Sequence, residues 1–130
     1  MAGEKILLID DNRFFLQILQ DAFSQSGFVV VTANDGASAV QAFQEHQPDA
    51  VISDLVMPGK GGVSTCLEIS SLAGDRDPVL VLLTSMFKGA PHEHESAEMG
   101  AKIHIPKSTP PLDIVIIVEQ LLERKRYRIP

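Results

Sequence analysis

The chain alternates short apolar runs with stretches in which apolar residues recur at helical spacing. Three of the runs, Lys5–Ile9, Ala50–Asp54 and Val79–Thr84, are almost entirely apolar and lack the polar alternation of a half-exposed strand. Such strands are typical of parallel sheets, because helices cover both faces of the sheet. The pattern therefore predicts an α/β domain.

Helical stretches follow the strands. Asn12 can cap a helix over Arg13–Gln25, and Gly27 ends that helix before a β-branched strand at 28–33. The remaining predicted elements are helices at 37–45, 63–72, about 91–99 and 112–124, and a short strand at Lys102–Ile105. Five strand–helix units indicate a doubly wound α/β fold, with a five-stranded parallel sheet between two helix layers.

Each helical repeat predicts an apolar face. The expected members are Phe14, Phe15, Ile18, Leu19, Ala22 and Phe23 in the first helix, Ala39, Val40 and Phe43 in the second, Val63, Cys66, Leu67 and Ile69 in the third, and Ile114, Val115, Ile117, Val118, Leu121 and Leu122 in the last. Ile116 falls on the opposite side of the last helix, among charged residues.

Length and composition fit one soluble domain. The chain has 130 residues, 45% of them hydrophobic and 22% charged, with a formal net charge of −6. This charge argues against direct nucleic-acid binding by the domain, and no run approaches the roughly 20 apolar residues of a membrane span. The amino terminus shows no secretory signal, so we expect a cytoplasmic protein. The single cysteine, Cys66, excludes an internal disulfide.

We place the domain at residues 1–124. The basic residues 125–130 either begin a linker to another module or form a helix end, where positive charge is favoured by the helix dipole. The sequence leaves both interpretations open.

Acidic side chains end two of the buried runs. Asp10 and Asp11 follow the first strand, and Asp54 closes the third. If these strands are neighbours, the three carboxylates converge at the carboxyl edge of the sheet, where open α/β folds bind ligands. A hard cation such as Mg²⁺, which prefers oxygen ligands, stabilises such a cluster.

Two more polar residues reach the same edge, since Thr84 ends the fourth strand and Lys107 follows the fifth. With this set in place, the whole chain resembles the response-regulator receiver domain of two-component signalling. The resemblance is carried by Asp10-Asp11, Asp54 with Met57-Pro58 and Gly62, Thr84-Ser85, Gly100-Ala101 and Lys107. It implies the flavodoxin-like strand order 2-1-3-4-5.

The resemblance also implies that Asp54 accepts a phosphoryl group from a sensor histidine kinase or a phosphotransfer protein. Asp11, Asp54 and the backbone carbonyl of Val56 would ligate Mg²⁺ directly, and Asp10 would act through bound water. Lys107 would pair with the phosphoryl oxygens. Such a domain is a switch and not an enzyme, apart from self-phosphorylation by small phosphodonors and slow autodephosphorylation.

Thr84 and His104 would form the switch. The resemblance implies that Thr84 donates a hydrogen bond to the phosphoryl group and that its movement reorients the side chain three residues before the lysine. Here that residue is His104, where the family has Tyr or Phe, so the switch could be altered or pH-sensitive. Ser108 also departs from the family, which has a cis-proline after the lysine.

Val56 and Met86 are a further departure. In this family these positions border the path of the water that hydrolyses the acyl phosphate. Two apolar side chains should make that water harder to position, so we expect slow loss of the phosphoryl group.

Ile116 suggests a partner surface. In this family the fourth helix, the fifth strand and the last helix form the signalling face. We therefore expect a phosphorylation-dependent homodimer or effector contact centred on Ile116, although a lone exposed apolar residue is also common by chance. The cognate kinase, the output and the oligomeric state are not readable from the sequence.

Four other functions have weaker or different support in the sequence. An aspartyl-phosphate phosphatase needs a second acid two residues after the nucleophile, where this chain has Val56. The sequence after the first strand lacks the glycine pattern of nucleotide-binding domains, and the turn at 59–62 lacks the spacing of a P-loop. A metal site of His46, His92, His94 and His104 is less expected than a solvated helix face. A receiver that acts as a docking scaffold without phosphorylation stays open.

Overall fold

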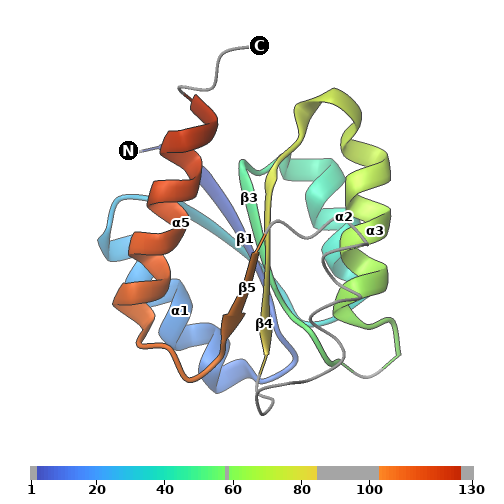
Figure 1. Cartoon of the computed structure of the whole chain (residues 1–130). Helices are drawn as coiled ribbons and strands as arrows, with labels where there is room; N and C mark the ends of the chain where they lie inside the picture. The colour runs from blue at the N-terminus through green and yellow to red at the C-terminus, as the bar shows by residue number, and fades with distance from the viewer. Residues whose placement is uncertain (1–2, 58, 85–102, 127–130) are drawn as a thin grey trace.

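The computed structural model describes residues 3–57, 59–84 and 103–126 (Figure 1). The strands are β1 (Lys5–Ile9), β2 (Val29–Ala33), β3 (Ala50–Asp54), β4 (Val79–Thr84) and β5 (Ile103–Pro106). The helices are α1 (Arg13–Gln25), α2 (Gly36–His46), α3 (Gly62–Ala73) and α5 (Pro111–Arg126), with a 3₁₀ turn at Gly74–Arg76. The helix expected at about 91–99 lies outside the described residues.

The five strands form one parallel sheet in the order β2-β1-β3-β4-β5. The predicted fold class and strand order are confirmed. All five strands therefore point their carboxyl ends to the same edge, which is where the polar residues were expected.

Helices cover both faces of the sheet. In Figure 1, α1 and α5 lie on one side and α2 and α3 on the other. Each side has its own core: Phe23, Ile52 and Val118 belong to the first, and Phe43, Val51 and Ile69 to the second. The central strands β1, β3 and β4 are buried on both faces, which explains their unbroken apolar sequences.

The predicted faces of α1 and α3 were partly wrong. Phe14 (77% exposed), Ile18 (37%) and Leu67 (43%) point away from the core. Leu16, which is not part of the predicted apolar face, is buried instead. The apolar repeat of α1 is wider than the strip of a helix that can touch one sheet, so part of it must face solvent.

The last helix follows its prediction. Ile114, Val115, Val118 and Leu122 are buried, and Ile117 and Leu121 pack against the same core. Ile116 is 48% exposed, as its place opposite the apolar stripe requires. Within the described parts of the chain, no helix is long and apolar enough to span a bilayer.

Candidate functional site

The strand register brings the sequence-predicted acids together. Ile9 of β1 pairs with Ser53 of β3, so the next residues, Asp10 and Asp54, lie side by side at the carboxyl edge. Thr84 ends the neighbouring strand β4 and pairs with Pro106 of β5. The predicted acidic edge is therefore assembled from residues far apart in the chain.

The three carboxylates can reach one another. One oxygen each of Asp10, Asp11 and Asp54 lies within 4.8 Å of the others. Asp10 is 1% exposed and Asp54 6%, whereas Asp11 faces solvent. The backbone N–H of Asn12 donates to Asp10 Oδ1 over 2.9 Å, which fixes the orientation of that carboxylate.

Lys107 is the cation at this edge. Its Nζ lies 2.8 Å from Asp10 Oδ2 and 3.5 Å from Asp54 Oδ2. Its backbone N–H donates to the carbonyl oxygen of Thr84 over 2.6 Å, so β5 pairing continues into the lysine. The described residues contain no cis peptide, and the bond to Ser108 is trans. Lys107 therefore points at the acids without a cis-proline after it.

Phe15 is a site residue that the sequence analysis missed. The Nζ of Lys107 lies 4.6 Å from the centre of the Phe15 ring, in cation–π geometry. The helical repeat identified Phe15 only as part of an apolar face. Nothing in the sequence marks a contact between residues so far apart in the chain.

The acids and Lys107 perturb one another. Burial raises the pKa of the Asp54 carboxyl, and the charge of Asp10 raises it further, while Lys107 and the Val56 N–H act in the opposite direction. Burial lowers the pKa of Lys107, but its hydrogen bond and charge interaction with Asp10 outweigh burial, and the pKa is raised overall. Because the surroundings disfavour ionisation of Asp54, a cation bound nearby would stabilise its carboxylate form.

Gly62 brings the start of α3 against the end of β3. A Cβ at this position would lie 2.2 Å from the carbonyl oxygen of Asp54 and 2.9 Å from the Cα of Leu55. The Gly62 N–H donates to the Leu55 carbonyl over 3.0 Å. Only glycine lets the backbone pass this close to the acidic strand end.

The other predicted residues occupy different places. Thr84 is buried at the edge, and Val56 is 60% exposed beside Asp54. His104 is half-buried on β5, opposite Leu82, and within the described residues its buried Nε2 has no hydrogen-bond partner. Met86 lies outside the described residues.

The donor set fits a hard divalent cation. Among the described residues, the acid, histidine or cysteine side chains close enough to share a metal are those of Asp10, Asp11 and Asp54. Three carboxylates supply oxygen ligands only, which suits Mg²⁺ and does not suit a soft metal.

Known sequences agree with this arrangement. The family model for the response regulator receiver domain matches residues 6–119. The probable transcriptional regulator ycf27 of Guillardia theta is 33% identical, over 93% of this chain and 46% of its own length. The response regulator MprA of Mycobacterium leprae (strain TN) is 30% identical, over 94% and 52%. The chain thus spans about half the length of these relatives.

Solved structures agree as well. A response regulator receiver domain protein from Clostridium thermocellum has a TM-score of 0.83 at 26% identity, covering 95% of this chain and 97% of the other. A CheY-like receiver domain protein from Methanospirillum hungatei JF-1 reaches 0.88 at 17% identity, with coverage of 96% and 98%. At that identity the second likeness shows the fold alone.

Proposed function

Because this chain belongs to the response-regulator receiver domain family, we propose that it is a signalling switch whose Asp54 accepts a phosphoryl group from a sensor histidine kinase or a phosphotransfer protein. The observation that supports the proposal is the edge cluster, in which Asp10, Asp11 and Asp54 lie within 4.8 Å and Lys107 reaches two of them. The domain is a phosphoacceptor and not an enzyme for a separate substrate.

The transfer is a substitution at phosphorus. A carboxylate oxygen of Asp54 attacks the phosphorus of a phosphohistidine, and the bond from phosphorus to the imidazole nitrogen breaks. The electron pair of that bond leaves with the imidazole, and an acyl phosphate forms on Asp54. Lys107 would pair with the phosphoryl oxygens, which its distance of 3.5 Å from Asp54 supports, and Thr84, at the end of the neighbouring strand, would donate a hydrogen bond to them.

Asp10, Asp11, Asp54 and the backbone carbonyl of Val56 are the groups that would hold Mg²⁺. When bound, the ion supplies positive charge that offsets the carboxylates and the transferred phosphoryl group. Asp11 suits direct ligation because it faces solvent, whereas the Asp10 carboxylate is already engaged by Lys107 and Asn12 and would act through water.

Intact mass measurement tests the assignment. Incubation with acetyl phosphate and Mg²⁺ should add one phosphoryl group to the wild type and none to Asp54→Asn. Asp21→Asn, which changes an exposed acid on α1, is the matched control and should be modified like the wild type. Equal modification of Asp54→Asn would disprove the assignment. A wild type that is never modified would favour the docking scaffold.

The acyl phosphate should be long-lived. Val56 lies 60% exposed next to Asp54 and offers no polar side chain to orient an attacking water. Positioning by a general base commonly contributes about 10²–10⁴-fold in rate. Val56→Asn combined with Met86→Glu should shorten the phosphorylated lifetime, while Val56→Leu should leave it unchanged. A lifetime in the double variant equal to that of the wild type would count against this proposal.

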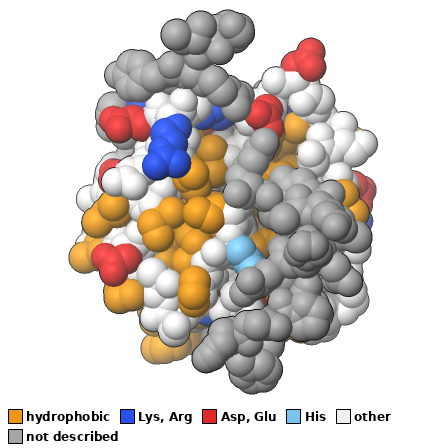
Figure 2. Space-filling view, viewed as in Figure 1, with side chains coloured by type: hydrophobic (Ala, Val, Ile, Leu, Met, Phe, Trp, Pro, Cys, Tyr) orange, Lys and Arg blue, Asp and Glu red, His pale blue; other side chains and the backbone are white. Residues whose placement is uncertain are grey.

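We expect phosphorylation to act on partners through the surface formed by β5 and α5. His104, the residue that we propose for the switch, lies on β5. Ile116 lies on the outer side of α5, in a groove of about 230 Å³ with Glu119, Glu123 and Arg126. Figure 2 shows apolar side chains gathered on the face that carries α5. We infer a homodimer or an effector contact on this face, centred on Ile116.

Sedimentation velocity with and without beryllofluoride tests the homodimer. The activated wild type should shift to a larger species, and Ile116→Glu should abolish the shift. Leu72→Glu, at a residue of similar exposure (46%) on α3, is the control and should still shift. If the mass does not change on activation, self-association is excluded, and the proposed contact at Ile116 can only be with a different protein.

A further inference from the structure

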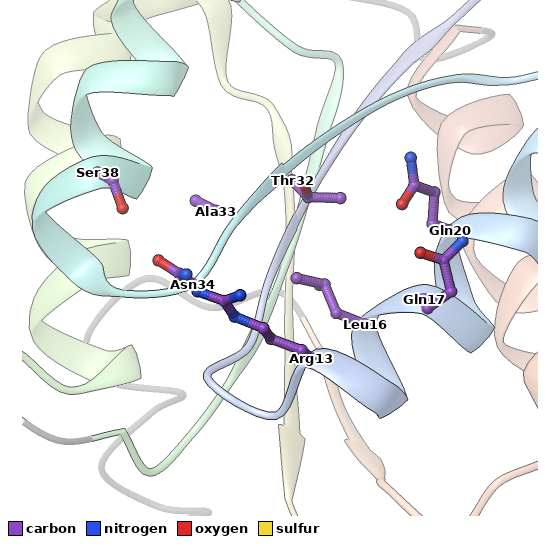
Figure 3. Close-up of a pocket in the computed structure, with 8 residues that line it drawn as sticks. All are labelled: Arg13, Leu16, Gln17, Gln20, Thr32, Ala33, Asn34 and Ser38. Carbon is purple, nitrogen blue, oxygen red and sulfur yellow. The ribbon is translucent and has the colours of Figure 1, made fainter.

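A cleft of about 390 Å³ lies at the open edge of the sheet, apart from the acidic site (Figure 3). Its polar lining comes from α1 through Arg13, Gln17 and Gln20, and from the end of β2 through Thr32 and Asn34. In Figure 3, Arg13, Gln17 and Gln20 project from α1 on one side of β2, and Ser38 of α2 lies on the other side. The acids of the proposed phosphorylation site do not line it.

Within the described residues, β2 presents to this cleft backbone groups that have no hydrogen-bond partner. It is the outermost strand and pairs with β1. The Val29 N–H donates to the Glu4 carbonyl over 2.9 Å, and the Ala33 carbonyl accepts from Asp10 over 3.1 Å, so these residues face β1. Successive residues of a strand point their backbone N–H and C=O groups to opposite sides. Val30 and Thr32 therefore direct these groups outward, away from β1.

Arg13 brings an unpaired positive charge to the same cleft. Among the described residues, it makes no hydrogen bond or ion pair, whereas Gln17 is held by Asp21 over 3.0 Å. In Figure 3 the guanidinium extends toward Asn34, into the space between α1 and β2. The start of α1 does not benefit from a cation, since the helix dipole favours anions there. A free guanidinium is suited to a carboxylate.

We propose that this cleft binds an extended peptide of a partner protein as an added strand on β2, with an acidic side chain of the peptide paired to Arg13. A row of outward N–H and C=O groups is matched by another backbone and not by a small molecule. The volume is at the low end for a small-ligand pocket, and the site continues along β2, where Val29 is 47% exposed.

A second copy of this chain fits the cleft less well. The five residues Val29–Ala33 carry no charge, so a second β2 would place no acid opposite Arg13. The nearest acid after the strand, Asp35, accepts hydrogen bonds from the N–H and hydroxyl of Ser38 and is engaged. β2 also lacks the charge or proline that commonly protects a free strand edge.

Backbone amide spectra of the whole ¹⁵N-labelled chain test the proposal. The probes are five capped pentapeptides of alternating Thr and Val, with one Glu moved through each position. At least one should shift the amide signals of Val30 and Thr32 and bind at least about fivefold more tightly than its Gln counterpart, because the charge pair is lost. Arg13→Gln should remove this preference for Glu, and Arg124→Gln, at an exposed arginine of α5, should keep it.

Four outcomes would overturn the proposal. The first is that no peptide shifts Val30 and Thr32, and the second is that N-methylation of the peptide backbone leaves binding unchanged. The third is that capped free glutamate reproduces the shifts, which indicates a small-carboxylate site. The fourth is that these amides shift with protein concentration alone, which indicates a second copy. Asp54→Asn should bind like the wild type, so this test is independent of phosphorylation.

Discussion

Gly62 shows how one residue controls the distance between two elements. The atoms that a Cβ would meet belong to the backbone of Asp54 and Leu55, at 2.2 and 2.9 Å. Backbone atoms of a buried strand cannot rotate away as the end of a flexible side chain can. A larger residue must therefore displace α3 or distort the strand end that carries the proposed phosphoacceptor.

Gly62→Ala should lower the free energy of unfolding by about 1–3 kcal/mol, the usual cost of overpacking. Gly61→Ala is the matched control, because its Cβ would lie 3.8 Å from the nearest atom, the Leu55 carbonyl oxygen, in ordinary van der Waals contact. Urea denaturation of both variants measures the difference. Equal losses would show that the close approach at Gly62 is not the cause.

Asp35 should give the domain a measurable pH dependence. The backbone N–H of Ser38, followed by its hydroxyl, donates to the carboxylate and lowers the pKa of Asp35. With the folded pKa below the unfolded value, the stabilisation is present above the unfolded pKa and is lost as pH falls through the folded pKa. Asp35→Asn keeps a cap acceptor but does not titrate.

The stability difference between wild type and Asp35→Asn should therefore be largest near neutral pH and shrink between about pH 4.5 and about pH 2. Urea denaturation of the two proteins at several pH values in this range measures it. A difference that stays constant across the range would mean that the charge of Asp35 contributes nothing to the cap.

At the element scale, α5 has two different faces. Its inner face, with Val118 and Leu122, is buried against α1 and the sheet. Its carboxyl end is held by an ion pair of Arg126 with Glu4 and by Lys125, whose Nζ donates to the Arg76 carbonyl over 2.9 Å. The outer face is left free for the contact proposed at Ile116.

Substitutions of two leucines of α5 should differ in their effect on the free energy of unfolding, because one leucine is buried and the other is exposed. Leu122 is 4% exposed and Leu112 is 62% exposed. Leu122→Ala should lower the free energy of unfolding by about 2–5 kcal/mol, because it removes buried methyl groups and leaves a cavity. Leu112→Ala should change it by about 0.5 kcal/mol or less. Thermal or urea denaturation measures both, and a large loss in Leu112→Ala would contradict the assigned faces.

At the scale of the whole molecule, the sheet separates two cores and joins them at its carboxyl edge. The acids at this edge come from β1 and β3, and the lysine follows β5, so the site exists only when the sheet is complete. A ligand that bridges these residues binds the folded chain and not the unfolded one. Its binding must therefore stabilise the whole domain.

Mg²⁺ should raise the free energy of unfolding of the wild type, by about 2.7 kcal/mol at a concentration one hundred times its Kd. Asp11→Asn should show a smaller increase, because it loses a charged ligand, and Asp21→Asn should respond like the wild type. Denaturation in MgCl₂ is compared with NaCl of equal ionic strength. If both salts stabilise the wild type equally, the acidic cluster does not bind Mg²⁺.

The order and kind of the described elements were readable from the sequence, because they depend on local periodicity. A central strand buried on both faces must be apolar throughout, and a helix on one face must repeat at helical spacing. The edge residues Asp10, Asp11, Asp54, Thr84 and Lys107 were readable for the same reason. Each adjoins the end of a recognisable strand, and parallel strands end at one edge.

Contacts between elements were not readable, because they depend on how helices rotate and pack over the sheet. Three findings are of this kind: Phe14 is exposed, the Phe15 ring lies beside Lys107, and Lys107 points at the acids without a cis-proline after it. The cleft at β2 does as well, since it joins α1, β2 and α2. The local sequence determines which side chains each element can bury. Which side chains of different elements come into contact depends on tertiary packing, and these contacts form the sites.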